Sequence, residues 1–235
     1  MKIPVIQGII ERRILINYRI TSDVIKEILP PQFRPVLYKD KAIGGICLIR
    51  FAQLRPKGLP AFVGFSSENG AHRFAVEWDE NGITRQGVYI PRRDSASWFN
   101  TMAGGCVFPG KHFHARFDVE EGNGHYKIAF TSSDKTTVAV DATETTVLNN
   151  DSIFGHLDNA SEFFKNGSLG YSPNGKGYDG LRLSIRDWQV TPLTVHSVHS
   201  GFFQNDAVFP KGSVEFDNAL LMKAVEHEWY SEQPM

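Results

Sequence analysis

Apolar and polar residues alternate along much of this chain, and a period of two is typical of β-strands. Residues 73–78 and 83–90 contain strand formers on either side of Asn81-Gly82. An Asn-Gly pair between two such runs predicts a hairpin. Residues 111–120 and 125–131 flank another glycine-containing turn and predict a second hairpin.

Other segments extend this strand-rich pattern. Further strands are predicted where β-branched or apolar residues dominate, over residues 11–20, 42–51, 136–147 and 181–185. Residues 214–229 fit either a strand or a helix, and the glycine-rich segment 167–180 is predicted to be a loop.

Helical patterns are few and short. One helix is predicted over residues 22–29, where Pro30-Pro31 ends it. A second is predicted over residues 158–165, and Asp94 is expected to cap a helical turn over 95–102. Many short strands with few helices predict a mainly β fold, either a sandwich or a closed barrel. Because no linker or repeat interrupts the pattern, we expect a single domain over residues 1–235.

Composition narrows the function classes. The 235 residues are 41% hydrophobic and 22% charged, as in an ordinary globular protein. The net charge is −1 with both signs interspersed, which argues against a nucleic-acid partner. No apolar run approaches the roughly 20 residues that span a bilayer, and no signal pattern opens the chain, so we expect no membrane partner and a cytoplasmic location.

The two cysteines form no disulfide framework; Cys47 is interpreted as a small core residue, and Cys106 either packs inertly or lines a site.

Lys111 is the first candidate for chemistry. Alternation places it on the same strand face as Phe113 and Phe117, which would bury its amine among aromatic rings. Burial favours a neutral amine, the form that attacks a carbonyl substrate to give a Schiff base. Alternatively, Lys111 lies in the turn before the strand and extends into solvent.

Several motifs together carry a family resemblance. They are Asn17-Tyr18-Arg19, residues 28–35, residues 44–50, residues 66–73, residues 87–94, residues 103–111 and residues 215–222. With them the chain resembles the acetoacetate decarboxylase-like superfamily, and more closely its bacterial branch called domain of unknown function 2071. The resemblance covers residues 11–229. It implies a cone-shaped, largely antiparallel β-barrel with a few short helices and a central cavity.

The resemblance also implies catalytic residues. In the decarboxylase two adjacent lysines follow a proline, and the first forms the Schiff base. Here the segment reads Pro109-Gly110-Lys111, so Gly110 stands in the nucleophile's place and Lys111 matches the second lysine. Simple acetoacetate decarboxylation is therefore not expected. The family's pocket glutamate matches Glu68, which would act as a general acid or base.

Substrate-binding residues follow from the same resemblance. The arginine that binds a substrate carboxylate matches Arg12 or Arg13, and alternation lets only one of these neighbours face the cavity. Arg92, Asn100 and Phe108 are further candidates from their positions in the matching segments. Structural alternatives stay open: Glu68 could pair with Arg73 or Arg92, Asp94 could only cap a helix, and Arg93 could be solvated.

Histidine pairs raise the question of a metal. His112 and His114 share one strand face, and His196 and His199 lie close in sequence. Alternation directs His112 and His114 away from the apolar face, so we expect no metal site and no cofactor.

Two function classes remain. The first is an enzyme acting on a small carbonyl-containing carboxylic acid, with Lys111 as the amine and Glu68 as the proton carrier. The second is a non-catalytic protein that binds a small carboxylate or keto acid. A homo-oligomer is left open, because relatives often assemble through barrel surfaces.

Overall fold

The computed structural model describes residues 4–97 and 108–235. Long strands dominate them: β1 (Ile6–Thr21), β4 (Lys41–Pro56), β5 (Phe65–Glu80), β6 (Ile83–Ser95), β7 (His112–Gly122), β8 (His125–Ser132), β9 (Thr137–Glu144), β11 (Tyr178–Ile185), β12 (Thr191–Ser200) and β13 (Val214–Glu232). Three strands are short: β2 (Arg34–Pro35), β3 (Leu37–Tyr38) and β10 (Leu169–Pro173). The helices are α1 (Ser22–Ile28), α3 (Leu157–Lys165), and the 3-10 turns η1 (Ala61–Val63) and η2 (Asn166–Ser168). No helix in the described ranges is long and apolar enough to cross a membrane.

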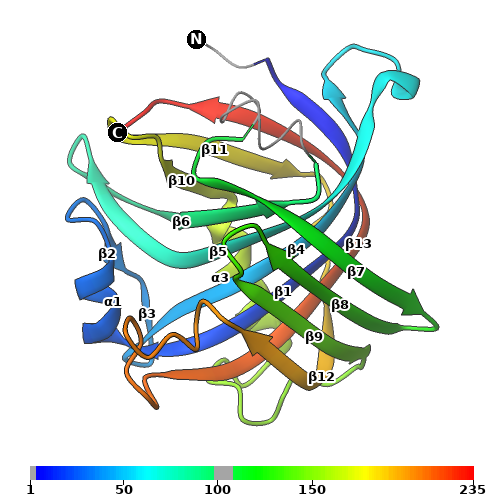
Figure 1. Cartoon of the computed structure of the whole chain (residues 1–235). Coiled ribbons are helices and arrows are strands. Elements are labelled where there is room, and N and C mark those ends of the chain that lie inside the picture. Colours follow the sequence, from blue (N-terminus) through cyan, green and yellow to red (C-terminus); the bar gives the residue numbers. More distant parts are fainter. Residues whose placement is uncertain (1–3, 98–107) are drawn as a thin grey trace.

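The strands of the described residues form one 13-stranded sheet that closes on itself (Figure 1). The order along the sheet is β11-β10-β6-β7-β8-β9-β12-β13-β1-β4-β5-β2, with β3 on β4. Additional pairings of β11 with β13 and of β5 with β6 close the ring. Most neighbours are antiparallel, whereas β6 pairs in parallel with β10 and with β7. The predicted mainly β architecture with few short helices is confirmed.

Individual elements follow the expectations unevenly. Both predicted hairpins and both predicted helices are present, and residues 214–229 lie in a strand. The prediction of a loop over 167–180 is wrong, because β10 and the start of β11 pair there despite the glycines. The expected helical turn after Asp94 is wrong where it is described, because Asp94 and Ser95 pair with β7 at the end of β6; its later residues lie outside the described ranges.

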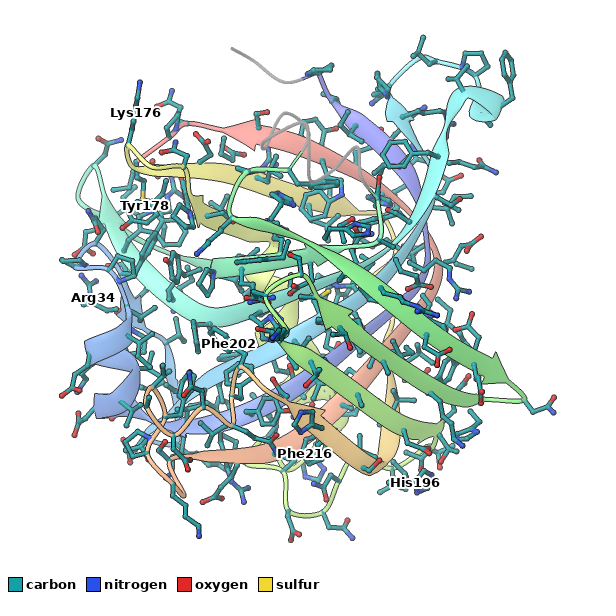
Figure 2. All side chains as sticks on the ribbon, viewed as in Figure 1. Arg34, Lys176, Tyr178, His196, Phe202 and Phe216 are labelled. Atoms are coloured by element: carbon teal, nitrogen blue, oxygen red, sulfur yellow. The ribbon has the colours of Figure 1, made fainter. Side chains whose placement is uncertain are left out.

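Two apolar cores lie on opposite faces of the long strands. The first core includes Ile14, Ile46, Phe74 and Phe130. Phe202 and Phe216, labelled in Figure 2, pack against it. The second core includes Leu15, Cys47, Ala71, Phe108 and Phe164. Because successive side chains of a strand alternate between faces, the middle of β1 and of β4 is buried on both sides.

A register shift near the start of β1 decides which arginine faces which core. The pairing of β1 with β4 is irregular between Ile10 and Arg12. Ile10 belongs to the second core, whereas Ile14 and Ile16, with the same parity, belong to the first. Such an irregularity reverses the facing of the residues beyond it. Arg12 consequently shares the face of the first core, and Arg13 shares the face of the second.

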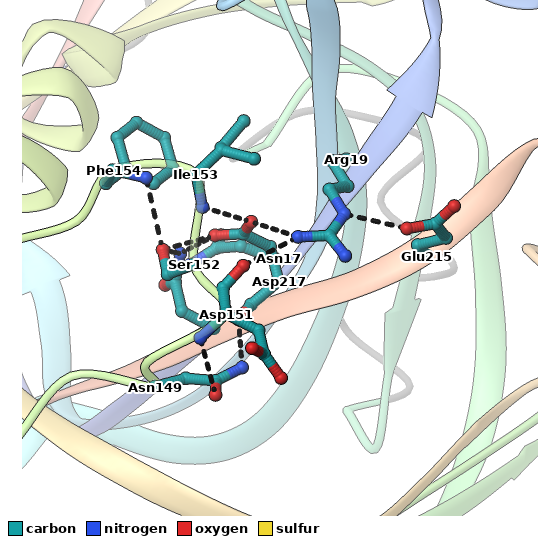
Figure 3. Close-up of polar contacts among 10 residues, drawn as sticks. Asn17, Arg19, Asn149, Asp151, Ser152, Ile153, Phe154, Glu215 and Asp217 are labelled. Carbon is teal, nitrogen blue, oxygen red and sulfur yellow. Dashed lines mark hydrogen bonds and ion pairs between the residues drawn. The ribbon is translucent and has the colours of Figure 1, made fainter.

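A buried carboxylate ties β13 to the loop before α3 (Figure 3). The Asp217 carboxylate accepts hydrogen bonds from Ser152 Oγ (2.6 Å), from the Ile153 backbone amide (2.9 Å) and from Asn218 Nδ2 (2.6 Å). Arg19 Nη1 lies 3.6 Å from it. If the carboxylate were removed, Ser152 Oγ and the Ile153 amide would lose this acceptor, and Asn218 Nδ2 would keep only a longer contact with Ser152 Oγ (3.4 Å).

We predict that Asp217→Ala lowers the free energy of unfolding by about 2 to 4 kcal/mol, because buried donors that lose their acceptor keep their desolvation cost. Urea unfolding of the variant and the parent measures this difference. Asp151→Ala is the matched control, since Asp151 is exposed and lies in the same loop. Equal losses in the two variants would contradict the importance of the Asp217 contacts.

Candidate functional site

A cavity of about 220 Å³ lies against the second core. Its wall is mostly apolar and includes Leu15, Cys47, Ile49, Phe51, Ala71, Val88, Ile90, Phe108, Phe164, Leu181, Leu183 and Trp229. The rings of Phe51 and Phe108 are nearly parallel, with centroids 5.8 Å apart, and Trp229 meets Phe108 edge-on. A concave, mostly apolar pocket with a few polar groups is the usual form of a small-molecule site.

Three arginines supply most of the charge in this wall. Arg13 comes from β1, Arg73 from β5 and Arg93 from β6. Each is held by a neutral acceptor, as Arg13 Nε donates to Cys47 Sγ (3.4 Å), Arg73 Nη2 to Asn17 Oδ1 (2.5 Å) and Arg93 Nε to the Pro109 carbonyl (2.9 Å). The guanidiniums of Arg73 and Arg93 also lie over the rings of Phe164 and Phe108.

None of these three arginines forms an ion pair with a carboxylate within residues 4–97 and 108–235. Burial lowers the pKa of Arg73 and of Arg93 to about 10, and both remain protonated at neutral pH. The nitrogens Arg13 Nη1 and Arg73 Nε are buried, and neither has a hydrogen-bond partner in the part of the chain that the structure describes. An unpaired buried charge is costly, so this pocket is suited to an anion.

The opposite face of the same strands is electrically compensated. Arg12 and Arg50 both pair with Glu68, at 2.5 Å in each case, and both also pair with Glu121. Arg92 pairs with Asp94 (2.7 Å) and Asp134 (2.5 Å). The sequence holds two Arg-Arg pairs, and in each pair the pleat sends one arginine to carboxylates and the other to the pocket.

Cys47 lies at the centre of the pocket arginines. Across the sheet, Leu15, Cys47, Ala71 and Arg93 form one row of paired residues. Arg13 pairs with Ile49, and Arg73 pairs with Gly45, so each lies one step diagonally from Cys47. Diagonal neighbours on one face are within reach of long side chains. The thiol thus accepts a hydrogen bond from the Arg13 guanidinium, and Arg73 and Arg93 lie in its row or one diagonal step away.

His112 also lines the pocket. Its Nε2 lies 2.7 Å from the Phe108 carbonyl, which fixes Nε2–H as the donor. Burial lowers its pKa to about 4, so the ring is neutral at pH 7. The expectation that His112 faces away from the interior is therefore wrong. Within the described ranges, no group of three His, Cys, Asp or Glu side chains could hold a metal ion.

The predicted catalytic residues do not meet in this pocket. Lys111 is exposed, and its Nζ lies 5.2 Å from the centre of the Phe113 ring. Its predicted inward orientation is wrong, because β7 begins only at His112 and the face of Phe117 and Val119 covers the first core. Glu68 is absent from the pocket wall, since its carboxylate turns to Arg12 and Arg50.

The predicted substrate-binding residues divide in the same way. Arg13 and Phe108 line the pocket. Arg12 and Arg92 do not, because both face carboxylates on the other side of the sheet. Asn100 and Cys106 lie outside the described residues. The sequence interpretation did not identify Arg73 or Cys47 as pocket residues, and it left open whether Arg93 is solvated; Arg93 lines the pocket.

Gly110 occupies a place that tolerates no side chain. Its φ of +117° lies in the region that favours glycine. A Cβ there would come within 2.7 Å of Ser172 Cβ and 3.7 Å of Arg93 Nε. The space next to this backbone is therefore filled by the Ser172 side chain, with Arg93 Nε in ordinary contact beyond it.

On the face of the first core, where the arginines pair with carboxylates, His72 is completely buried. Neither ring nitrogen has a hydrogen-bond partner among the described residues, and Asp94 Oδ2 lies 3.7 Å from Nδ1. Phe202 packs on the ring with centroids 4.6 Å apart. Burial, with Arg92 nearby, lowers the pKa of His72 to about 3.

Comparisons with known proteins agree with this architecture. The family model of domain of unknown function 2071, described as an uncharacterized conserved protein, matches residues 10–222. No protein with a curated description matches the chain in sequence.

Solved structures share the fold at low identity. Acetoacetate decarboxylase from Legionella pneumophila has a TM-score of 0.61 at 10% identity, over 97% of this chain and 87% of that one. An acetoacetate decarboxylase-like enzyme from Sphingomonas wittichii RW1 has a TM-score of 0.62 at 8% identity, over 100% and 93%. The enduracididine biosynthesis enzyme MppR, complexed with pyruvate, has a TM-score of 0.56 at 11% identity, over 98% and 88%. The expected acetoacetate decarboxylase-like fold is confirmed.

We predict that protonation of His72 weakens the protein as pH falls. The folded-state pKa of about 3 is below the ordinary value near 6.5, so between these values the unfolded chain binds a proton that the folded chain does not. The part of the unfolding free energy that depends on neutral His72 is therefore fully present above pH 6.5. It declines by about 1.4 kcal/mol per pH unit as the pH falls from 6.5 toward 3. His72→Phe should flatten the slope of unfolding free energy between pH 6.5 and 5.

The matched control is His196→Phe, because His196 is exposed on the outside of β12 (Figure 2). Urea unfolding at several pH values gives each slope. If His72→Phe and the parent lose stability equally on acidification, His72 is not the group responsible.

Proposed function

The chain belongs to the family of domain of unknown function 2071, and we propose that its pocket binds a small organic acid with an apolar body. The observation that carries this proposal is the set of pocket arginines, Arg13, Arg73 and Arg93, which have no carboxylate partner within the described residues. An anionic group would neutralise charge there, and the apolar wall would bury the rest of the ligand.

A carboxylate fits these donors better than a neutral ligand does. Guanidinium nitrogens bind carboxylate oxygens with good geometry, and each such charged hydrogen bond is worth about 1.5 to 3 kcal/mol. The parallel rings of Phe51 and Phe108 and the edge-on Trp229 offer aromatic contacts to an attached ring or chain. A related fold supports an acidic ligand, as MppR was solved with pyruvate.

Binding without imine chemistry is the version that we favour. No lysine lines the pocket within the described residues, and Lys111 is exposed. The second candidate is an enzyme acting on the bound acid, which the fold similarity to decarboxylase-like enzymes supports. In that case Cys47 and the neutral His112 are wall residues able to react or exchange a proton.

We predict that benzoate binds the purified protein and that benzamide, which lacks the negative charge, does not. Arg13→Gln and Arg73→Gln should each weaken benzoate binding about ten- to hundredfold, since each removes a charged hydrogen-bond donor. Isothermal titration calorimetry measures the affinities, and circular dichroism verifies that the variants are folded.

Arg116→Gln is the control with the same change of charge, because Arg116 is exposed and lies outside the pocket wall. It should bind benzoate as the parent does. Equal binding of benzoate and benzamide, or no loss in either pocket variant, would reject the proposed anion site.

A separate prediction concerns Lys111. Pyruvate with borohydride should add no mass at Lys111, and Lys111→Ala should leave benzoate affinity unchanged, because this amine lies outside the pocket. Peptide mass spectrometry detects the adduct. A reduced pyruvate adduct at Lys111 would support an enzyme that forms a Schiff base through this lysine. It would contradict the proposal that the protein binds an acid without imine chemistry.

A further inference from the structure

We infer that Cys47 is a nucleophile site for electrophilic organic acids, that is, carboxylic acids with a leaving group or a polarised double bond next to the carboxylate. This inference rests on the proposed anion pocket and adds to it a reacting atom. Nothing in the fold similarity assigns a function to this cysteine.

The geometry places a sulfur where an anion would be held. Cys47 lines the cavity and is free of any disulfide. Arg13 Nε donates to its Sγ, and Arg73, which also lines the cavity and is only 5% exposed, has no hydrogen-bond partner for its Nε among the described residues. The pairing of Cys47 with Ala71, and of Ala71 with Arg93, brings the third guanidinium to the same row.

Recruitment of the carboxylate would decide which reagents reach the sulfur. A cleft with charge of one sign raises the local concentration of counter-ions by roughly 10- to 1000-fold. A carboxylate held by Arg13 and Arg73 leaves its α and β carbons next to the diagonal neighbour of both, Cys47. A neutral reagent of the same reactivity gains nothing from these charges.

The reaction with an α-halo acid is balanced as a substitution. The sulfur forms a bond to the α carbon, the carbon–halogen bond breaks, and the halide leaves with the bonding pair. The thiol proton is released to solvent. With an α,β-unsaturated acid the sulfur adds to the β carbon, and the α carbon takes a proton.

Alkylation by iodoacetate and by its neutral analogue iodoacetamide tests the inference. Rates at Cys47 are measured by peptide mass spectrometry in a Cys106→Ser background and are compared with the same two rates for 2-mercaptoethanol. We expect the iodoacetate-to-iodoacetamide ratio at Cys47 to exceed that of the free thiol by about tenfold or more. Benzoate should slow the iodoacetate reaction, and Arg13→Gln should remove most of the preference.

Arg116→Gln should keep the preference for iodoacetate over iodoacetamide, because Arg116 is exposed. This control distinguishes the charge of the pocket from the net charge of the protein. A ratio equal to that of 2-mercaptoethanol, or no alkylation of Cys47 by iodoacetate, would overturn the inference. If benzoate still binds in calorimetry while Cys47 shows no preference, the anion pocket stands and only the nucleophile site fails. If benzoate does not bind either, both fail.

Discussion

The separation of charge across one pleated sheet is the constraint on which the rest of this structure depends. The strands β1 and β6 each contain two adjacent arginines, and alternation forces each pair apart. On the face of the first core, buried arginines meet carboxylates from Glu68, Asp94 and neighbours, and burial is compensated. On the face of the second core the guanidiniums meet only neutral acceptors within the described residues. That imbalance makes the cavity a place for an anion.

The positions of the pocket arginines depend on the closed sheet around them. Arg73 is held by Asn17, which donates to Asn218, and Asn218 donates to the buried Asp217. A chain of hydrogen bonds thus connects a pocket guanidinium with the carboxylate that anchors β13 to the loop before α3. Arg93 is held by the backbone carbonyl of Pro109, just before the glycine whose close approach to Ser172 leaves no room for a side chain.

Much of the fold could be predicted from sequence, because hairpins and short helices carry local signals such as Asn81-Gly82 and Pro30-Pro31. The site could be predicted only in part, because facing depends on where each strand starts and where it is irregular. Alternation alone predicts that Lys111 points inward, yet β7 starts only at His112 and the face of Phe117 and Val119 covers the first core. The Glu68 carboxylate does not line the pocket because it pairs with Arg12 and Arg50, which are distant from it in sequence. A usable signal for Arg93 was present, since two adjacent arginines on a buried strand must face opposite sides.

The most direct test of the anion pocket is a crystal structure of the protein soaked with 4-bromobenzoate, in which the anomalous signal of bromine locates the ligand. We expect the bromine between the apolar walls near Phe51 and Phe108, with the carboxylate within hydrogen-bond distance of Arg13, Arg73 or Arg93. A carboxylate bound elsewhere, or a cavity that stays without bromine signal at saturating ligand, would contradict the account.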